Sequence, residues 1–383
     1  METPTTPKRQ GLRPPVVASA VLVLVTAVVV PAAILVRGGG ASEGRTRTYY
    51  IAADPVDWDY APAGHNLLGG HFDADAPTFL ENGPDRIGHV NKKSMYREYT
   101  DDSFSKLLGR TERWEHLGLL GPVIHAEVGD TVKVVFKNNT PFPASMHPHG
   151  LRYDKASEGA EYEDGTSGKD KADDAVPPGG MHTYIWEVPE RAGPGPHDES
   201  SVVWAYHSHT DEIAETNAGL IGPIVVTRRG MARPDGSPKD VDREFVTLFN
   251  IYDENVSPWL DENIKQFTGD PSKVDKEDPG FVESNLKHSI NGFLYGNLPG
   301  LDMKAGEKVR WYAMAAGTET GLHTPHWHGN TVLSMGMRMD NIELLPMSMK
   351  VADMVPDAKG SWLYHCHVND HIAGGMAALF TVK

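Results

Sequence analysis

Histidine pairs of the form His-x-His constrain this chain more than any other feature of its sequence. Four such pairs occur: His147/His149, His207/His209, His326/His328 and His365/His367. Residues two apart on a β-strand face the same side, so each pair is expected to present two imidazoles together. Imidazoles without accompanying carboxylates suit copper better than Mg²⁺ or Ca²⁺. The pairs therefore predict a copper cluster held by histidines.

The two halves of the chain repeat each other. The segment Trp204–His209 in the first half corresponds to Trp362–His367 in the second. Each follows an earlier His-x-His-Gly segment, His147–Gly150 in the first half and His326–Gly329 in the second. Two correspondences in the same order indicate a duplicated domain.

The pattern from residue 46 onward is that of an all-β protein. Short runs rich in β-branched and aromatic residues alternate with clusters of Gly, Pro, Asn and Asp, which predicts many short strands. These runs include Tyr49–Ile51, Val132–Phe136, Thr183–Val188, Ile221–Val226 and Phe245–Ile251. Such strands favour sandwiches or barrels. We expect domain 1 over 47–229, a Gly- and Pro-rich linker over 230–243, and domain 2 over 244–383.

The single cysteine, Cys366, lies between His365 and His367. Three more donors accompany it in the sequence: His323, His371 and Met376. Two imidazoles, a thiolate and a thioether are the ligands of a blue electron-transfer copper. Neighbouring strand residues face opposite sides, so Cys366 should point away from the cluster histidines. A short Cys-His path, on the order of ten ångström, would then join the blue copper to the cluster.

The first 46 residues predict export. Residues 1–15 form a basic N-terminus, and residues 16–36 form an apolar run long enough to cross a bilayer, which needs about 20 residues. The basic flank is expected to stay cytoplasmic, and residues 37–46 form a tether. This predicts a single-pass protein of the cell membrane with an extracytoplasmic catalytic part. The alternative is a cleaved signal peptide and secretion.

The formal net charge of −16 limits the partners. A nucleic-acid partner needs a basic face, so none is expected. Strong negative charge is compatible with the attraction of cationic substrates such as metal ions.

Together these motifs resemble the multicopper oxidases over nearly all of the chain after Arg45. The resemblance implies two cupredoxin-like Greek-key β-sandwiches with about four copper ions per active unit. It assigns the type 1 copper to His323, Cys366, His371 and Met376, and the type 2 copper to His147 and His326. It assigns the type 3 pair to His149, His207, His209, His328, His365 and His367. Ser208 stands where the first half would need a cysteine, so only the second half is expected to hold a blue copper.

The resemblance also implies the reaction. A multicopper oxidase couples the one-electron oxidation of a reduced substrate to the four-electron reduction of O₂ to water. Cys366 would carry the electrons, and Glu158 matches an acid near the cluster that can supply protons.

Longer segments resemble ceruloplasmin and hephaestin, among them Trp58–Ala61, Gly118–Pro122, Gly219–Pro223 and Glu283–Asn285. This likeness implies ferroxidase activity, with an Fe(II) substrate site formed by Glu283, His288, Asp370 and Glu319. Asp173 and Asp174 resemble a calcium-binding pair of ceruloplasmin. Those relatives close a ring of cupredoxin domains, and three of the present chains placed head to tail would rebuild it. We therefore expect a homotrimer with a cluster between each two chains.

Other functions fit parts of the same pattern. A laccase-like enzyme would oxidise phenols at the same copper. Met335, Met337 and Met339 are expected to alternate on one strand face, and soft thioethers suit Cu(I), so a cuprous oxidase is conceivable, although such a stripe is more often packing. A protein like copper nitrite reductase is less favoured, because such proteins lack the full histidine set that this chain has. A copper-binding or electron-carrier protein would not need the cluster ligands.

Overall fold

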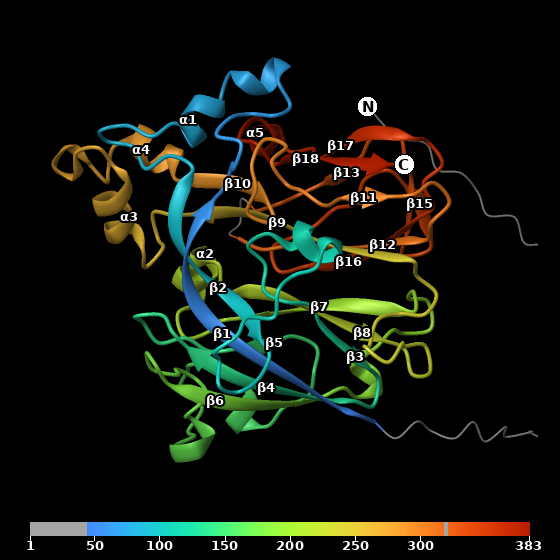
Figure 1. The fold of residues 1–383 in the computed structure, drawn as a ribbon. Coiled ribbons are helices and arrows are strands. Elements are labelled where there is room, and N and C mark those ends of the chain that lie inside the picture. Colours follow the sequence, from blue (N-terminus) through green and yellow to red (C-terminus); the bar gives the residue numbers. More distant parts are fainter. Residues whose placement is uncertain (1–43, 318–320) are drawn as a thin grey trace, which may run out of the picture. The chain divides into compact units, whose positions relative to one another are not determined.

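The computed structural model describes residues 44–317 and 321–383 (Figure 1). The chain is mostly β, as predicted, and its helices are short. The predicted anchor or signal at 16–36 and the predicted iron ligand Glu319 lie outside the described residues. Within the described ranges, no helix is long and apolar enough to cross a membrane.

Two four-stranded sheets come from the first part of the chain. One has the order β2 (Val90–Tyr99), β1 (Thr46–Asp59), β4 (Thr131–Asn138), β6 (Met181–Glu187). The other has the order β3 (Ile124–Glu127), β8 (Ile221–Thr227), β7 (Ser201–His207), β5 (His147–Pro148). Burial alternates residue by residue along β4, as expected for a strand with one face on a core.

The second part of the chain repeats this arrangement. A six-stranded sheet has the order β10 (Leu286–Ile290), β9 (Arg243–Asp253), β12 (Val309–Ala315), β16 (Met349–Met354), β14 (Val332–Ser334), β15 (Met337–Met339). A four-stranded sheet has the order β11 (Asp302–Met303), β18 (Ala377–Val382), β17 (Gly360–Cys366), β13 (Pro325–Trp327). Within the described residues, no sheet mixes strands from the two sides of segment 228–242, in keeping with the repeat read from the sequence.

In the described ranges, five short α-helices connect the strands: α1 (Ala76–Leu80), α2 (Glu212–Ala218), α3 (Leu260–Phe267), α4 (Pro279–Ser284) and α5 (Asn369–Ala373). Helix α2 follows β7 in the first half, and α5 follows β17 in the second. Helices α2 and α5 therefore each begin a few residues after a His-x-His pair.

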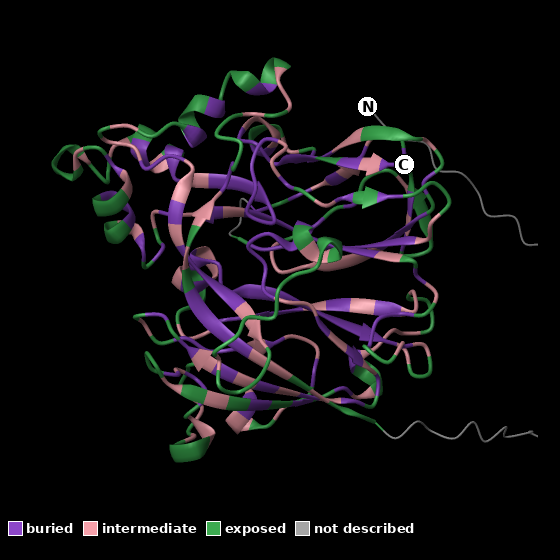
Figure 2. Ribbon diagram, viewed as in Figure 1, coloured by how far each residue is buried: buried purple, intermediate pink, exposed green. Residues whose placement is uncertain are grey.

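A shared apolar core joins the two halves. Strands β8 and β12 are buried along their whole length (Figure 2). In β8, Ile224 and Val226 enter the core of the first half, whereas Ile221 and Val225 enter the shared core. In β12, Tyr312 and Met314 also enter the shared core. A strand buried on both faces loses the polar alternation of a solvated strand, which explains the continuous apolar run in β8.

A buried ion pair also crosses between the halves. Lys93 on β2 and Glu254, just after β9, have fully buried side chains and form a salt bridge. The Tyr60 hydroxyl donates a hydrogen bond of 2.5 Å to the same Glu254 oxygen. Glu254 thus has two partners from the first half of the chain.

Replacing Glu254 by Ala is expected to lower the free energy of unfolding by roughly 3–5 kcal/mol, because it leaves the Lys93 ammonium buried without a counter-charge. Asp57→Ala is the matched control. It breaks the neighbouring exposed pair Lys92–Asp57, which spans 3.0 Å, and should cost less than about 1 kcal/mol. Thermal and denaturant unfolding of both variants measures the difference; similar losses would show that the buried pair has no special weight.

Candidate copper centres

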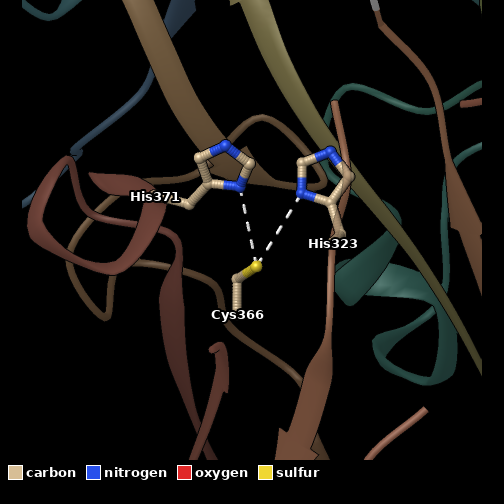
Figure 3. A group of neighbouring side chains, drawn as sticks. All are labelled: His323, Cys366 and His371. Atoms are coloured by element: carbon tan, nitrogen blue, oxygen red, sulfur yellow. Dashed lines mark hydrogen bonds between the residues drawn. The ribbon is translucent and has the colours of Figure 1, made fainter. Parts of the chain in front are cut away.

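The three donors His323, Cys366 and His371 come together in the second half (Figure 3). The Cys366 Sγ atom lies 3.9 Å from His323 Nδ1 and 3.6 Å from His371 Nδ1. Cys366 ends β17, His371 lies on α5, and His323 precedes β13. All three side chains are buried. Ligand atoms that share one metal ion at about 2.0–2.3 Å lie roughly 3.5–4 Å apart, so the spacing fits a bound metal.

The surroundings of Cys366 favour a metal ligand over a reactive thiol. Burial raises the pKa of the Cys366 thiol, so a cation is needed to hold it as a thiolate. The Thr324 amide approaches Sγ at 3.4 Å as a donor. His323 Nε2 is buried and has no hydrogen-bond partner among residues 44–317 and 321–383. Met376 is fully buried, and its carbonyl accepts a hydrogen bond from the Cys366 amide, which places the two residues side by side.

A second group contains His326, His328, His365 and His367. His365 Nε2 lies 3.0 Å from His328 Nε2 and 3.2 Å from His326 Nδ1, and the His367 ring stacks on that of His326. The Nδ1–H group of His365 donates to the Cys366 carbonyl at 2.8 Å. A carbonyl only accepts, so His365 Nε2 carries a lone pair that faces its neighbours.

The first half forms a matching group of His147, His149, His207 and His209. His207 Nδ1 donates to the Ser208 carbonyl at 3.0 Å, which directs its Nε2 lone pair to His149 Nε2, also at 3.0 Å. The rings within each predicted pair lie 5.5 Å and 5.4 Å apart. His147 Nδ1 donates to the Glu158 carbonyl at 2.7 Å. Among the described residues, no ring contact joins this group to the histidines of the second half.

Burial keeps four of the ligand imidazoles neutral. Burial, followed by the neighbouring histidines, lowers the pKa of His207 to about 3 and that of His149 to about 4. In the second half, burial lowers the pKa of His323 to about 3 and that of His365 to about 4. A neutral imidazole has the lone pair that a metal requires, so these four histidines can bind copper well below neutral pH.

The two faces of β17 separate the two kinds of centre. Cys366 faces His323 and His371, whereas its neighbour His365 faces the histidine group. This agrees with the strand alternation expected from the sequence. The residues present therefore fit a one-ion site with a thiolate on one face and an all-imidazole site on the other.

The first half keeps the framework of the thiolate site but not its ligands. The Ser145 amide donates to Ser208 Oγ at 2.9 Å, as the Thr324 amide does to Cys366. The Ser208 amide donates to the Leu220 carbonyl, as that of Cys366 does to Met376. By the same register the buried carboxyl of Glu215 stands where the second half has His371. Burial raises its pKa to about 7. The equivalence of Glu215 and His371 cannot be seen by counting residues from Ser208 and Cys366, because the loops before α2 and α5 differ in length.

The structure also describes three predicted iron ligands and the predicted proton donor Glu158. His288 on β10 is buried beside His371, with ring centroids 5.4 Å apart, and its Nδ1 has no hydrogen-bond partner in the part of the chain that the structure describes. Glu283 and Asp370 are exposed on α4 and α5. The Glu158 carboxylate pairs with Lys155 at 2.5 Å and accepts from Tyr162.

The predicted calcium pair is buried. Asp173 accepts from the Gly159 amide at 2.7 Å, and Asp174 pairs with Lys171 at 3.0 Å. One Asp173 oxygen has no hydrogen-bond partner. The described residues bring no further acid to this pair within metal-binding distance, and a calcium site here stays a prediction.

Comparison with known proteins identifies the family of this chain. Two family models, each described as multicopper oxidase, match residues 117–230 and 267–383. Human hephaestin is 44% identical over 89% of this chain, and rat ceruloplasmin is 45% identical over 88%. The mouse protein named ferroxidase HEPHL1 is 45% identical over 88%. The chain spans 29–32% of the length of these relatives.

Solved structures show the same fold. A multicopper oxidase crystal structure matches 88% of this chain and 89% of its own, with a TM-score of 0.55 and 19% identity. A copper nitrite reductase from Nitrosomonas europaea matches 88% of this chain and 94% of its own, at a TM-score of 0.55 and 17% identity. At this level of identity the likeness shows the fold alone. The histidine motifs and the family models are more specific than the fold, and by them this chain belongs to the multicopper oxidase family.

Proposed function

We propose that this protein is a ferroxidase, which oxidises Fe(II) and passes the electrons to O₂. The observation that carries the proposal is the place of His288, which is buried against His371 and whose Nδ1 atom has no hydrogen-bond partner among the described residues. A donor bound at His288 would lie one imidazole away from the thiolate site. One of the similar mouse proteins is named a ferroxidase, which is consistent with this assignment.

The remaining iron ligands are proposed as Glu283, Asp370 and Glu319. Helix α4, with Glu283, leads directly into β10 and His288, whereas Asp370 precedes His371 on α5. Exposed carboxylates at the surface and a buried imidazole beneath them would accept a hard cation from solution. The net charge of −16 would raise the local concentration of such a cation.

The copper ions would be held by the ligands that the family pattern assigns. His323, Cys366, His371 and Met376 would hold the type 1 ion, His147 and His326 the type 2 ion, and the six remaining histidines the type 3 pair. Bound copper would accept electrons one at a time and supply the redox chemistry for O₂ reduction. The protein itself buries the thiolate from water and fixes the imidazole tautomers through carbonyls. Glu158, beside His147, is the proposed proton donor.

The separation of the two histidine groups supports a trimer as the active form. Each group contains four histidines, and no described ring contact connects them within one chain. Chains placed head to tail would bring the first group of one chain to the second group of the next. Such contacts close into a ring when the rotation fits three copies.

The iron-site proposal predicts a donor-selective defect. The double variant Glu283→Gln/Asp370→Asn is expected to raise the KM for Fe(II) about tenfold, because two exposed carboxylate ligands are lost. Oxidation of a phenol should change by less than about twofold, since the buried thiolate site is untouched. Steady-state O₂ uptake with each donor measures both effects.

The matched control is Glu277→Gln/Asp357→Asn, which removes the same charge from two other exposed acids. It separates loss of local ligands from loss of general cation attraction. Equal losses for Fe(II) and phenol, or equal effects of the two double variants on Fe(II), would contradict a dedicated iron site. A laccase-like enzyme would give the first of these outcomes.

A further inference from the structure

A cavity of about 640 Å³ lies between the two halves and is lined by three methionines and two histidines: Met335, Met347, Met349, His149 and His197. Strands β7 and β16 form its walls. Met349 and Met347 also pack against the shared core, whereas Met335 is 67% exposed. The sequence predicted a different stripe, Met335, Met337 and Met339 on one strand. That prediction was wrong for Met335, which lies in the turn before β15 rather than in the strand.

Two of these methionines occupy backbone positions that favour glycine or asparagine. Met335 (φ 52°) and Gly336 (φ 74°) form the two-residue loop between β14 and β15. Positive φ at both residues is the type I′ hairpin geometry, in which Asn-Gly is preferred. Met347 (φ 53°) follows Pro346 in a turn closed by the Ser348 amide and the Leu345 carbonyl at 3.0 Å, a position that glycine normally takes in a type II turn.

These turns therefore carry methionine at a cost to backbone stability. Non-glycine residues held at positive φ are strained, and such strain gathers at functional sites. Neither turn needs a methionine for its own geometry, and Met335 gains little from burial. Yet both side chains line the same cavity. What Met335 and Met347 have in common is a thioether side chain that lines the cavity.

Each charged side chain of the cavity lining has a partner. Glu190 pairs with Arg229 at 2.8 Å, Lys350 pairs with Glu343, and Arg191 donates to the Gly150 carbonyl. Asp198 accepts from the Gly195 amide at 2.8 Å, and Glu199 lies 3.7 Å from Arg310. His197 is exposed and makes no hydrogen bond or ion pair within residues 44–317 and 321–383. The donors left to meet a ligand are thus thioethers and imidazole, which suit Cu(I) better than Fe(II) or Ca²⁺.

We infer that Met335, Met347, Met349 and His197 form a Cu(I)-binding site that delivers copper to His149 by exchange of thioether for imidazole ligands. The ion stays Cu(I) throughout, so no electron donor or acceptor is needed. The proposal that Cu(I) binds in the cavity depends only on the residues that line it. The delivery role rests on the proposed function, because His149 is a copper ligand only under that proposal.

Titration of the anaerobic, fully reduced, copper-loaded full-length protein with Cu(I) against the chromophoric chelator bicinchoninate tests the binding step, because reduced resident copper does not oxidise the added Cu(I). We expect about one Cu(I) beyond the resident copper, and at least about tenfold weaker binding in Met335→Leu/Met347→Leu/Met349→Leu. Leucine keeps the size of methionine and removes only the sulfur. The control Met181→Leu/Met337→Leu changes two exposed methionines outside the cavity and should bind as the parent does. Equal affinity of the triple variant and the parent would overturn the site.

Two further measurements keep the result independent of folding. Met335→Asn suits its turn better than methionine, so it should bind Cu(I) more weakly at an unchanged or higher Tm. The redox-inert ion Ag(I), added to the loaded protein, should show thioether sulfur in its X-ray absorption fine structure, and the triple variant should show none. A first shell of nitrogen and oxygen only would contradict a methionine site.

The delivery step is measured on copper-depleted full-length protein given limiting Cu(I). The triple variant should bind copper at the histidine groups at least about tenfold more slowly than the Met181→Leu/Met337→Leu control. Equal loading rates would overturn delivery. Parent protein that binds Cu(I) in the cavity but never turns blue or consumes O₂ would instead refute the proposed function and leave the cavity site standing.

Discussion

Replacing Cys366 by Ser is expected to abolish the blue colour of the copper-loaded protein and to lower kcat by at least about a thousandfold. Cys366 is the only cysteine, and its sulfur is the only soft anionic donor facing His323 and His371. A serine hydroxyl is a hard donor that does not ionise at this buried position, so the site would lose its affinity and its route for electrons. Visible absorption, bound copper per chain and O₂ uptake measure the three losses.

The control for this variant is Ser208→Ala, at the equivalent place in the first half. The Ser145 amide meets Ser208 as the Thr324 amide meets Cys366. Because the first half has no thiolate, Ser208→Ala should remain as blue as the parent. About three coppers per chain should also remain in Cys366→Ser, since the histidine groups are intact. A Cys366→Ser protein that stayed blue would show that the type 1 assignment is wrong.

Mixed assembly of two inactive chains is expected to restore activity. In the proposed trimer, each cluster takes His147, His149, His207 and His209 from one chain and the second-half histidines from the next. His149→Ala removes a copper ligand from the first half only. Cys366→Ser removes the thiolate from the second half only. Every trimer that contains both variants has one intact interface of three, so the mixed trimers should show about a third of the parent activity.

Coexpression of the two variants with different affinity tags, followed by tandem purification and O₂ uptake, measures this recovery. Each variant expressed alone supplies the inactive baseline. Light scattering should give about three times the chain mass. If the cluster lay within one chain, no mixture could recover activity. A fully active monomer would likewise contradict the trimer.

Much of the site could be predicted from the sequence because its ligands follow strand periodicity. His365, Cys366 and His367 alternate at the end of β17, so their opposite directions follow from local geometry alone. The duplicated segments then place His207 and His209 in the same way, at the end of β7 and just beyond it. Predicted strand runs likewise fall in β1, β4, β6, β8 and β9.

Features that depend on the register between distant segments could not be predicted. The place of Glu215 opposite Ser208 follows from hydrogen bonds across a loop, which no spacing rule supplies. The methionine stripe was misplaced because a two-residue turn interrupts the strand at Met335. Met347 and Met349 join Met335 through the pairing of β14 with β16, a pairing between segments that are apart in the sequence.

The stoichiometry of Fe(II) oxidised per O₂ consumed tests the central claim most directly. Reduction of O₂ to two waters takes four electrons, so the copper-loaded protein should oxidise about four Fe(II) per O₂ and release no H₂O₂. An oxygen electrode and the absorbance of Fe(III), read on the same sample with a peroxide assay, give the ratio. A ratio of about two with accumulating H₂O₂, or Fe(II) oxidation no faster than in the Cys366→Ser protein, would contradict a multicopper ferroxidase.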